Sequence, residues 1–174
     1  VNLVAAIDDV PDADTDRLYM WGHSMGGMVA LRTLLVTDRI RAATLWSSVG
    51  GDLWEQAYHY SRYADPLAVD ASDVEKSRVA ELREQIAELD GPFDTKSVNP
   101  YNYLDDLQTP VIIQHAIGDG GAAYKWSVRL AKDLYLREKT YEFWTFDSAN
   151  HLFSNDNMEI AADRDVAFFR RFAD

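Results

Sequence analysis

One pentapeptide constrains the fold of this chain more than any other feature. It is GHSMG at residues 22–26, a G-x-S-x-G pattern that follows a short apolar run at residues 17–21 and precedes an aliphatic, helix-like run at residues 25–36. A serine that ends a strand and at once begins a helix must occupy a sharp, strained turn, with its hydroxyl clear of the backbone. The pattern therefore predicts a strand–turn–helix unit that presents Ser24 as a nucleophile.

The residues around Ser24 fit this chemistry. Gly22 and Gly26 flank the serine, and we expect that side chains there would collide with the neighbouring strand and helix. The amide of Met25 would lie at the N-terminus of the helix, where unpaired N–H groups and the helix dipole favour an oxyanion. The alternative is a glycine-rich turn in which Ser24 only caps the helix.

Apolar runs alternate with helix-like segments along the rest of the chain. The expected strands are residues 17–21, 42–47, 110–115 and 140–146, and the expected helices are residues 1–9, 25–36, 124–137 and 158–172. This alternation favours an α/β fold, with a mostly parallel sheet of about four strands flanked by helices. The length of 174 residues fits a single domain over residues 1–174.

Residues 50–107 interrupt this alternation between the second and third strands. Apolar side chains at helical spacing within residues 73–89 predict a helical insertion, which we expect to be a lid or cap. An elaborated edge of the domain is the alternative. Four aromatic residues in the insertion indicate an apolar or aromatic acyl pocket, or plain packing: Trp54, Tyr58, Tyr60 and Tyr63.

Composition excludes several classes of function. Seventeen lysine and arginine residues against 29 aspartate and glutamate residues give a net charge of −12, which repels nucleic acids and anionic membrane surfaces. The chain has no cysteine, so thiol catalysis and thiolate metal sites are excluded, and we expect no cofactor and no metal. Without a membrane-length apolar run or a visible signal peptide, we expect a soluble protein, cytoplasmic rather than secreted.

A serine nucleophile needs a histidine base, and the chain has four histidines. His151 lies just after the fourth expected strand, at the edge where catalytic loops of parallel sheets gather, so we expect it to be the base. A solvated loop histidine is the alternative. His23 is expected to point away from the serine hydroxyl and to pack or hydrogen-bond, while His59 lies in the insertion and His115 ends the third strand.

The acid that orients this histidine is expected on the loop after the third strand. Asp119 stands there among three glycines, within reach of a histidine one strand away. Its alternative role is to cap the helix that begins near Tyr124, and Asp147 is the rival acid. The chain order Ser24, Asp119, His151 is typical of α/β-hydrolases.

Three segments carry a resemblance to a known family: DRLYMWGHSMGGMVAL, NYLDDLQTPVIIQHAIGD and FDSANHLFS. The chain resembles the C-terminal part of an α/β-hydrolase of the prolyl-oligopeptidase-like type. In that family these segments hold the nucleophile, the triad aspartate and the triad histidine, which fall on Ser24, Asp119 and His151. The resemblance implies a serine hydrolase, either an esterase or a peptidase, that uses no cofactor.

The chain departs from this family in two places. The family usually has Val-Pro where this chain has Ala122 and Ala123, so we expect a looser loop after Asp119. A full member has four strands and a helix before the segment that begins here, including the loop with the second oxyanion amide. Residues 17–21 would then be an exposed sheet edge, so we expect either a fragment of a longer enzyme or a homo-oligomer, a dimer or higher, that covers the edge.

The sequence alone favours hydrolysis of small carboxylic esters, with short or aromatic acyl groups, through an acyl-enzyme on Ser24. An incomplete oxyanion hole costs roughly 100- to 1000-fold in rate, and activated esters tolerate this loss better than amides. One alternative is the catalytic domain of a prolyl-oligopeptidase-like peptidase. The other is an inactive scaffold that lacks a complete oxyanion hole.

Overall fold

The computed structural model describes most of the chain. It covers residues 2–60, 94–147, 150–154 and 156–173, together with residues 73, 77, 80, 81, 84, 85, 87 and 88. The chain divides into two compact units, one of Val1–Val49 with Tyr103–Asp174 and one of Gly50–Asn102. A lid function for the expected insertion at residues 50–107 stays a prediction.

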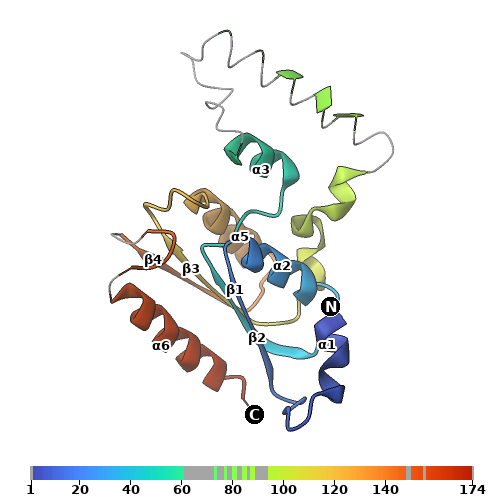
Figure 1. Cartoon of the computed structure of the whole chain (residues 1–174), viewed down its shortest axis with the longest axis vertical. Helices are drawn as coiled ribbons and strands as arrows, with labels where there is room; N and C mark the ends of the chain where they lie inside the picture. The colour runs from blue at the N-terminus through green and yellow to red at the C-terminus, as the bar shows by residue number, and fades with distance from the viewer. Residues whose placement is uncertain are drawn as a thin grey trace. The chain divides into compact units, whose positions relative to one another are not determined.

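The first unit contains a four-stranded parallel sheet (Figure 1). Its strands lie in chain order, β1-β2-β3-β4. The strands are β1 (Leu18–His23), β2 (Ile40–Trp46), β3 (Val111–Ala116) and β4 (Tyr141–Phe146). Because all strands run in the same direction, their carboxyl ends meet at one edge of the sheet, where ligand sites of such folds lie. The expected α/β class, with about four parallel strands, is confirmed.

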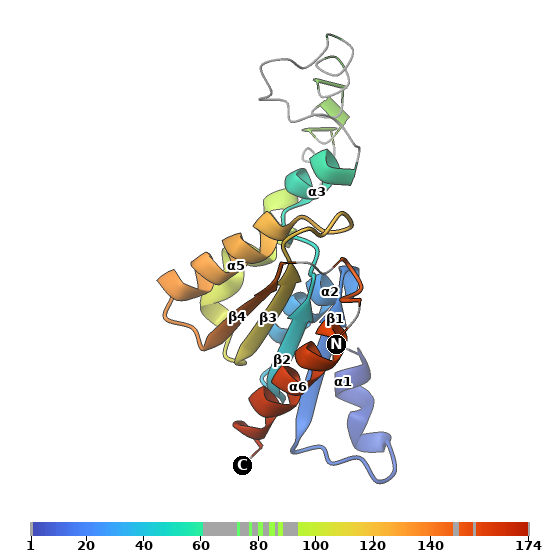
Figure 2. The same cartoon turned by 90° about the vertical axis from the view of Figure 1, so that its left-hand side faces the viewer.

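Helices cover both faces of this sheet (Figure 2). Helices α2 (Met25–Leu34) and α5 (Tyr124–Leu136) pack on one face, and α6 (Asn157–Arg170) packs on the other. The N-terminal helix is shorter than the expected residues 1–9, because α1 (Asn2–Ala6) passes into a 3₁₀ turn, η1 (Ile7–Asp9). Among the described residues, no helix has both the length and the apolar content needed to cross a bilayer. A cytoplasmic location stays a prediction.

The second unit contains helix α3 (Leu53–Tyr60) and the 3₁₀ segment η2 (Thr95–Val98). A further 3₁₀ segment, η3 (Pro100–Asp106), crosses from this unit into the first. Most of the helix expected at residues 73–89 lies outside the described residues. Tyr63 and the side chains of Tyr58 and Tyr60 also lie outside them, so the expected aromatic acyl pocket stays a prediction.

Burial follows the position of each strand in the sheet. Every residue of β3 is buried, and in β2 only Arg41 is partly exposed. This fits central strands that are covered on both faces. The outer strands β1 and β4 each have only one buried residue. Burial is therefore greatest where helices cover the sheet on both faces, although all four strands are rich in apolar residues.

A buried carboxylate joins α6 to the two central strands. Asp165, only 6% exposed, accepts hydrogen bonds from Thr44 Oγ1 at 2.7 Å, from Trp46 Nε1 at 2.9 Å and from Gln114 Nε2 at 2.8 Å. Burial outweighs these three donors and raises the pKa of Asp165 from 3.8 to about 6. This network holds α6 against the sheet. At neutral pH, however, the ionisation of buried Asp165 costs part of the free energy of folding.

We therefore predict that this carboxyl makes the fold less stable as pH rises from about 4 to above 6. The folded state binds the Asp165 proton more tightly than the unfolded state does, so its contribution is present below pH 3.8 and is lost through pH 6. At about 1.36 kcal/mol per pKa unit, the loss is about 3 kcal/mol. The measurement is the free energy of unfolding in urea between pH 4 and 7, for wild type and for Asp165→Asn. The difference between the two should change with pH. The control is Asp163→Asn, at an exposed position of α6, and a pH-independent Asp165→Asn difference would contradict the prediction.

The edge strand β1 is the basis of a second prediction. In the described sheet β1 pairs with β2 on one side only, and the side chain of Trp21 is 56% exposed. We predict that the 174-residue chain, of 19.7 kDa, associates with further copies through this edge, and that salt favours assembly by screening the charge of −12. Light scattering tests this with Trp21→Lys, which should weaken assembly. Leu3→Lys, at an exposed position of α1, is the control, and a stable monomer would contradict the prediction.

Candidate active site

Ser24 lies in a strained turn between β1 and α2. Its backbone has φ 57° and ψ −124°, a conformation that costs a non-glycine residue about 1–3 kcal/mol. Three backbone hydrogen bonds hold it there, from Ser24 N to the Trp46 carbonyl and from the amides of Gly27 and Val49 to the Ser24 carbonyl. Although Ser24 precedes the helix, its side chain makes no capping hydrogen bond. The helix-cap alternative for Ser24 is therefore wrong.

Two glycines permit the close approach of strand and helix. A Cβ on Gly22 would lie 2.5 Å from the Gly26 carbonyl oxygen, and one on Gly27 would lie 2.6 Å from Ser48 Oγ. A Cβ on Gly26 would meet nothing within 4 Å. The expected collision is therefore present at Gly22, but the expectation for Gly26 is wrong. The second close contact is one residue later, because that position faces Ser48.

His151 and Asp119 form a direct pair at the carboxyl edge of the sheet. Asp119 follows β3 and His151 follows β4, and the His151 Nδ1 lies 2.8 Å from Asp119 Oδ2 and 3.0 Å from Oδ1. Because the carboxylate accepts, Nδ1 carries the hydrogen and Nε2 is left with a lone pair that can take a proton. This is the geometry that a histidine base and its orienting acid require.

The Asp119 carboxylate is buried and strongly hydrogen-bonded. Its side chain is fully covered, and Oδ1 also accepts from the amides of Gly121 at 2.7 Å and Ala122 at 3.0 Å. Burial raises the pKa of Asp119, but hydrogen bonds from His115, from the Ala122 amide and from His151 outweigh it, so the pKa lies below its ordinary value. Asp119 therefore stays a carboxylate.

These contacts also exclude the alternative role of Asp119. The residue that caps α5 is Ala123, which makes no side-chain cap, so Asp119 does not cap this helix. Ala122 is fully buried and packs with Val49 and Trp126. Ala122 thus fills a core position, and the expectation of a looser loop after Asp119 stays a prediction.

A second histidine, which the sequence analysis did not connect with the site, contacts the same carboxylate. His115 is fully buried, and its Nε2 lies 3.3 Å from Asp119 Oδ2 and 3.2 Å from the Ala122 carbonyl. Its Nδ1 lies 2.6 Å from Ser127 Oγ. Since a carbonyl only accepts, His115 carries its hydrogen on Nε2 and accepts from Ser127. His115 lies near the end of β3, and Asp119 follows it by four residues on the next loop. This short spacing is the sequence signal that would have identified the contact.

The loop that carries His151 is anchored in the core. Phe153 is fully buried. The centroid of its ring lies 5.1 Å from that of the Trp46 ring and 5.0 Å from that of the Phe146 ring. Asn150 closes the turn by accepting from the amides of Leu152 and Phe153. The two residues before Asn150 lie outside the described part. This anchor fixes the backbone on the C-terminal side of His151.

The structure brings together some sequence candidates and separates others. His23, which precedes Ser24, is hydrogen-bonded to the His151 carbonyl, so the serine turn and the histidine loop are neighbours. Asp147, the rival acid, is exposed, and His59 lies on α3 in the second unit. Within the described ranges, no group of three or more His, Asp or Glu side chains is arranged to hold a metal ion.

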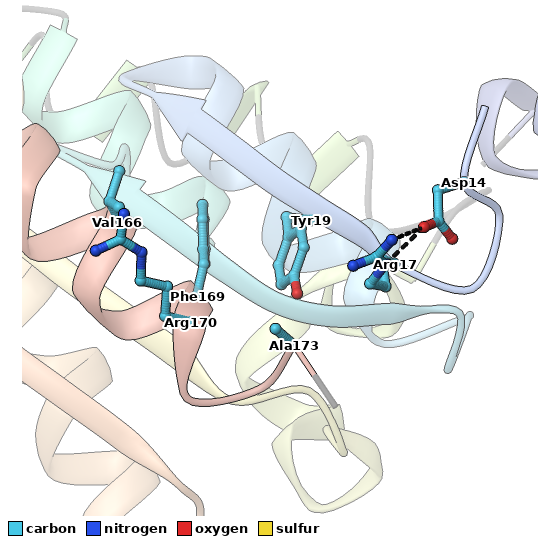
Figure 3. Close-up of a pocket in the computed structure, with 7 residues that line it drawn as sticks. All are labelled: Asp14, Arg17, Tyr19, Val166, Phe169, Arg170 and Ala173. Atoms are coloured by element: carbon cyan, nitrogen blue, oxygen red, sulfur yellow. Dashed lines mark hydrogen bonds and ion pairs between the residues drawn. The ribbon is translucent and has the colours of Figure 1, made fainter. Parts of the chain in front are cut away.

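A surface cavity of about 480 Å³ lies at the other end of the sheet (Figure 3). It is lined by Asp14, Arg17, Tyr19, Val166, Phe169, Arg170 and Ala173. Tyr19 stands near the beginning of β1 and stacks on Phe169 of α6, with ring centroids 4.9 Å apart. Because β1 reaches Ser24 only at its carboxyl end, this cavity lies away from Ser24.

We predict that Gly121 is essential for the position of His151. A Cβ at Gly121 would lie 2.9 Å from His151 Cγ, so Gly121→Ala should push the imidazole away from Asp119. A displacement of this size should slow labelling of Ser24 by a fluorophosphonate about ten- to hundred-fold. Gly120→Ala is the matched control, because a Cβ there meets nothing within 4 Å, and it should label at the wild-type rate. Equal rates for the two variants would contradict the prediction.

Comparison with solved structures finds the same fold in several peptidases. The chain is similar to a puromycin-hydrolysing peptidase of Mycobacterium tuberculosis, with 21% identity and a TM-score of 0.72 over 98% of this chain and 24% of that one. It is also similar to the acylaminoacyl peptidase of Pyrococcus horikoshii, with 16% identity and a TM-score of 0.69 over 97% of this chain and 26% of that one. Dipeptidyl peptidase 4 of Porphyromonas gingivalis gives 17% identity and a TM-score of 0.69, over 97% and 21%.

The chain thus spans about a quarter of the length of these structural relatives. No curated protein matches its sequence. The sequence model of the prolyl oligopeptidase family matches residues 2–174, nearly the whole chain. The chain therefore belongs to the prolyl oligopeptidase family and has the α/β-hydrolase fold of that family.

Proposed function

We propose that this chain is the catalytic part of a serine peptidase of the prolyl oligopeptidase type, with Ser24 as nucleophile, His151 as base and Asp119 as orienting acid. The observation that carries the proposal is the Asp119–His151 hydrogen bond of 2.8 Å beside the strained turn of Ser24. Family membership over residues 2–174 supports the same reading.

The reaction follows from where the hydrogens lie. With its Nδ1–H donated to Asp119, His151 takes the Ser24 hydroxyl proton on Nε2 while Oγ attacks the substrate carbonyl carbon. The tetrahedral intermediate collapses when His151 returns that proton to the leaving amine, which leaves an acyl group on Ser24. Water then attacks the acyl-enzyme through the same base, and the carboxylic acid is released.

The helix that begins after Ser24 supplies charge stabilisation in this proposal. Met25 is the first residue of α2, and the first four N–H groups of a helix have no partner within it. We expect the Met25 amide to face the region where the oxyanion develops, next to the attacking Ser24, and the helix dipole favours negative charge there.

The comparisons favour amide substrates over esters. The named structural relatives are all peptidases, whereas the ester preference expected from the sequence was based on a missing second oxyanion donor. Ester hydrolysis by the same acyl-enzyme is the second candidate. It needs a smaller rate enhancement than amide hydrolysis, so an enzyme that cleaves amides through Ser24 also cleaves activated esters.

The first test of the proposal is the chemistry itself. The chain should be labelled by a fluorophosphonate and should cleave both aminoacyl p-nitroanilides and p-nitrophenyl esters, and Ser24→Ala should abolish all three reactions. Turnover of esters without anilides would favour the ester candidate. A folded wild-type chain that neither labels nor turns over any of these compounds would overturn the proposal and favour an inactive scaffold.

The acid assignment is tested with a matched pair of aspartates. Asp119→Asn should lower kcat about 10³- to 10⁴-fold, because an amide no longer holds His151 in the required tautomer. Asp147→Asn, at an exposed position on the next loop, should leave kcat near the wild-type value. A larger loss in Asp147→Asn than in Asp119→Asn would show that the acid is Asp147.

A further inference from the structure

His23 connects the two parts of the proposed active site. It is the last residue of β1 and precedes Ser24 directly, and its Nε2 lies 2.8 Å from the carbonyl oxygen of His151. The His23 and His151 rings also pack together, with centroids 4.6 Å apart and an angle of 44° between planes. These contacts join positions 128 residues apart in the chain.

The hydrogen bond places a hydrogen on Nε2 of the His23 ring. A carbonyl oxygen only accepts, so His23 carries a hydrogen on Nε2 and donates it to the backbone of His151. Trp21 stacks on the His23 ring with centroids 6.2 Å apart, which restricts the rotamers open to this side chain. The donor is therefore held in place by its neighbour on the same strand.

The contact of His23 differs from the other restraints on His151. Asp119 binds the imidazole ring of His151, and Phe153 anchors the loop two residues later. Only His23, among the contacts described, binds the carbonyl of His151 itself and comes from the segment that carries Ser24. The distance between nucleophile and base therefore depends on this bond more directly than on the other two.

We propose that His23 is a positioning residue that sets the location of the proposed base, by donating a hydrogen bond from the serine turn to the His151 carbonyl. This inference rests on the proposed function, in which His151 takes the proton of Ser24. His23 itself takes no part in proton transfer, because its Nε2–H is committed to a backbone carbonyl.

Two substitutions separate the hydrogen bond from the packing of the ring. His23→Phe keeps an aromatic ring beside His151 but removes the donor. His23→Gln removes the ring but places an amide N–H at nearly the distance from the backbone that His Nε2 has. Both variants are compared with wild type by thermal unfolding, so that a loss of fold is not mistaken for a loss of position.

The kinetic measurement is the rate of fluorophosphonate labelling at Ser24, with kcat and KM for a p-nitrophenyl ester. We expect His23→Phe to lower the labelling rate and kcat about ten- to hundred-fold with little change in KM, because the base is displaced while substrate contacts remain. We expect His23→Gln to restore both to within about three-fold of wild type. A His23→Phe rate equal to wild type, or a His23→Gln rate as low as that of His23→Phe, would overturn the inference.

A second measurement does not depend on activity. Nitrogen-15 NMR of the imidazoles reports which nitrogen of His151 carries the hydrogen, and the wild-type chain should show it on Nδ1, bonded to Asp119. In His23→Phe the His151 signal should move towards a mixture of both tautomers, while in His23→Gln it should stay near wild type. An unchanged His151 signal in His23→Phe would overturn the inference even if the chain fails to react. If the wild-type chain does not react but the His151 signal still changes in His23→Phe, the inference stands and the proposed function is overturned.

Discussion

The carboxylate of Asp119 is the interaction on which the arrangement of this site depends. It accepts two amides of its own loop, the imidazole of His151 and, at a longer distance, that of His115. A buried charge is tolerated only when it is fully hydrogen-bonded, so each of these donors is needed by the fold as well as by the proposed chemistry. The loop after β3 is therefore folded around the charge that orients His151.

The serine turn is held by a different means, backbone strain supported by close packing. Ser24 keeps its positive φ because its amide and carbonyl are both hydrogen-bonded, to Trp46, Gly27 and Val49. Gly22 allows the helix backbone to come within contact distance of the strand. The strained conformation leaves the hydroxyl free of helix capping, which is what a nucleophile requires.

The parts of the fold that were predictable from the sequence have local signals. Apolar runs bounded by turn residues indicate all four strands. The GHSMG pattern indicates the turn at Ser24, because a glycine two residues before the serine lets the strand and the helix approach closely. Loop position and chain order predict Asp119 as the acid and His151 as the base, and the structure places these two side chains in contact.

The remaining features depend on contacts between distant segments. The donor role of His23 and the close approach of Gly121 both involve His151, far away in sequence, and no local pattern indicates them. The error at Gly26 has the same origin, since only the packing of Ser48 shows that Gly27 is the crowded position. A strand pattern identifies which residues are buried, but it does not show which partner each one meets.

Trp46 connects the serine turn, the histidine loop and helix α6. Its carbonyl accepts the amide of Ser24, its indole N–H donates to Asp165 of α6, and its ring packs against Phe153 of the histidine loop. One residue at the end of a central strand thus contacts the serine turn, the histidine loop and the helix on the other face of the sheet. Because proteins pack densely and side chains there have few alternative rotamers, a shift of Trp46 would move all three elements together. The geometry of the site is therefore a property of the sheet edge as a whole, and the position of Ser24 cannot change independently of the position of His151.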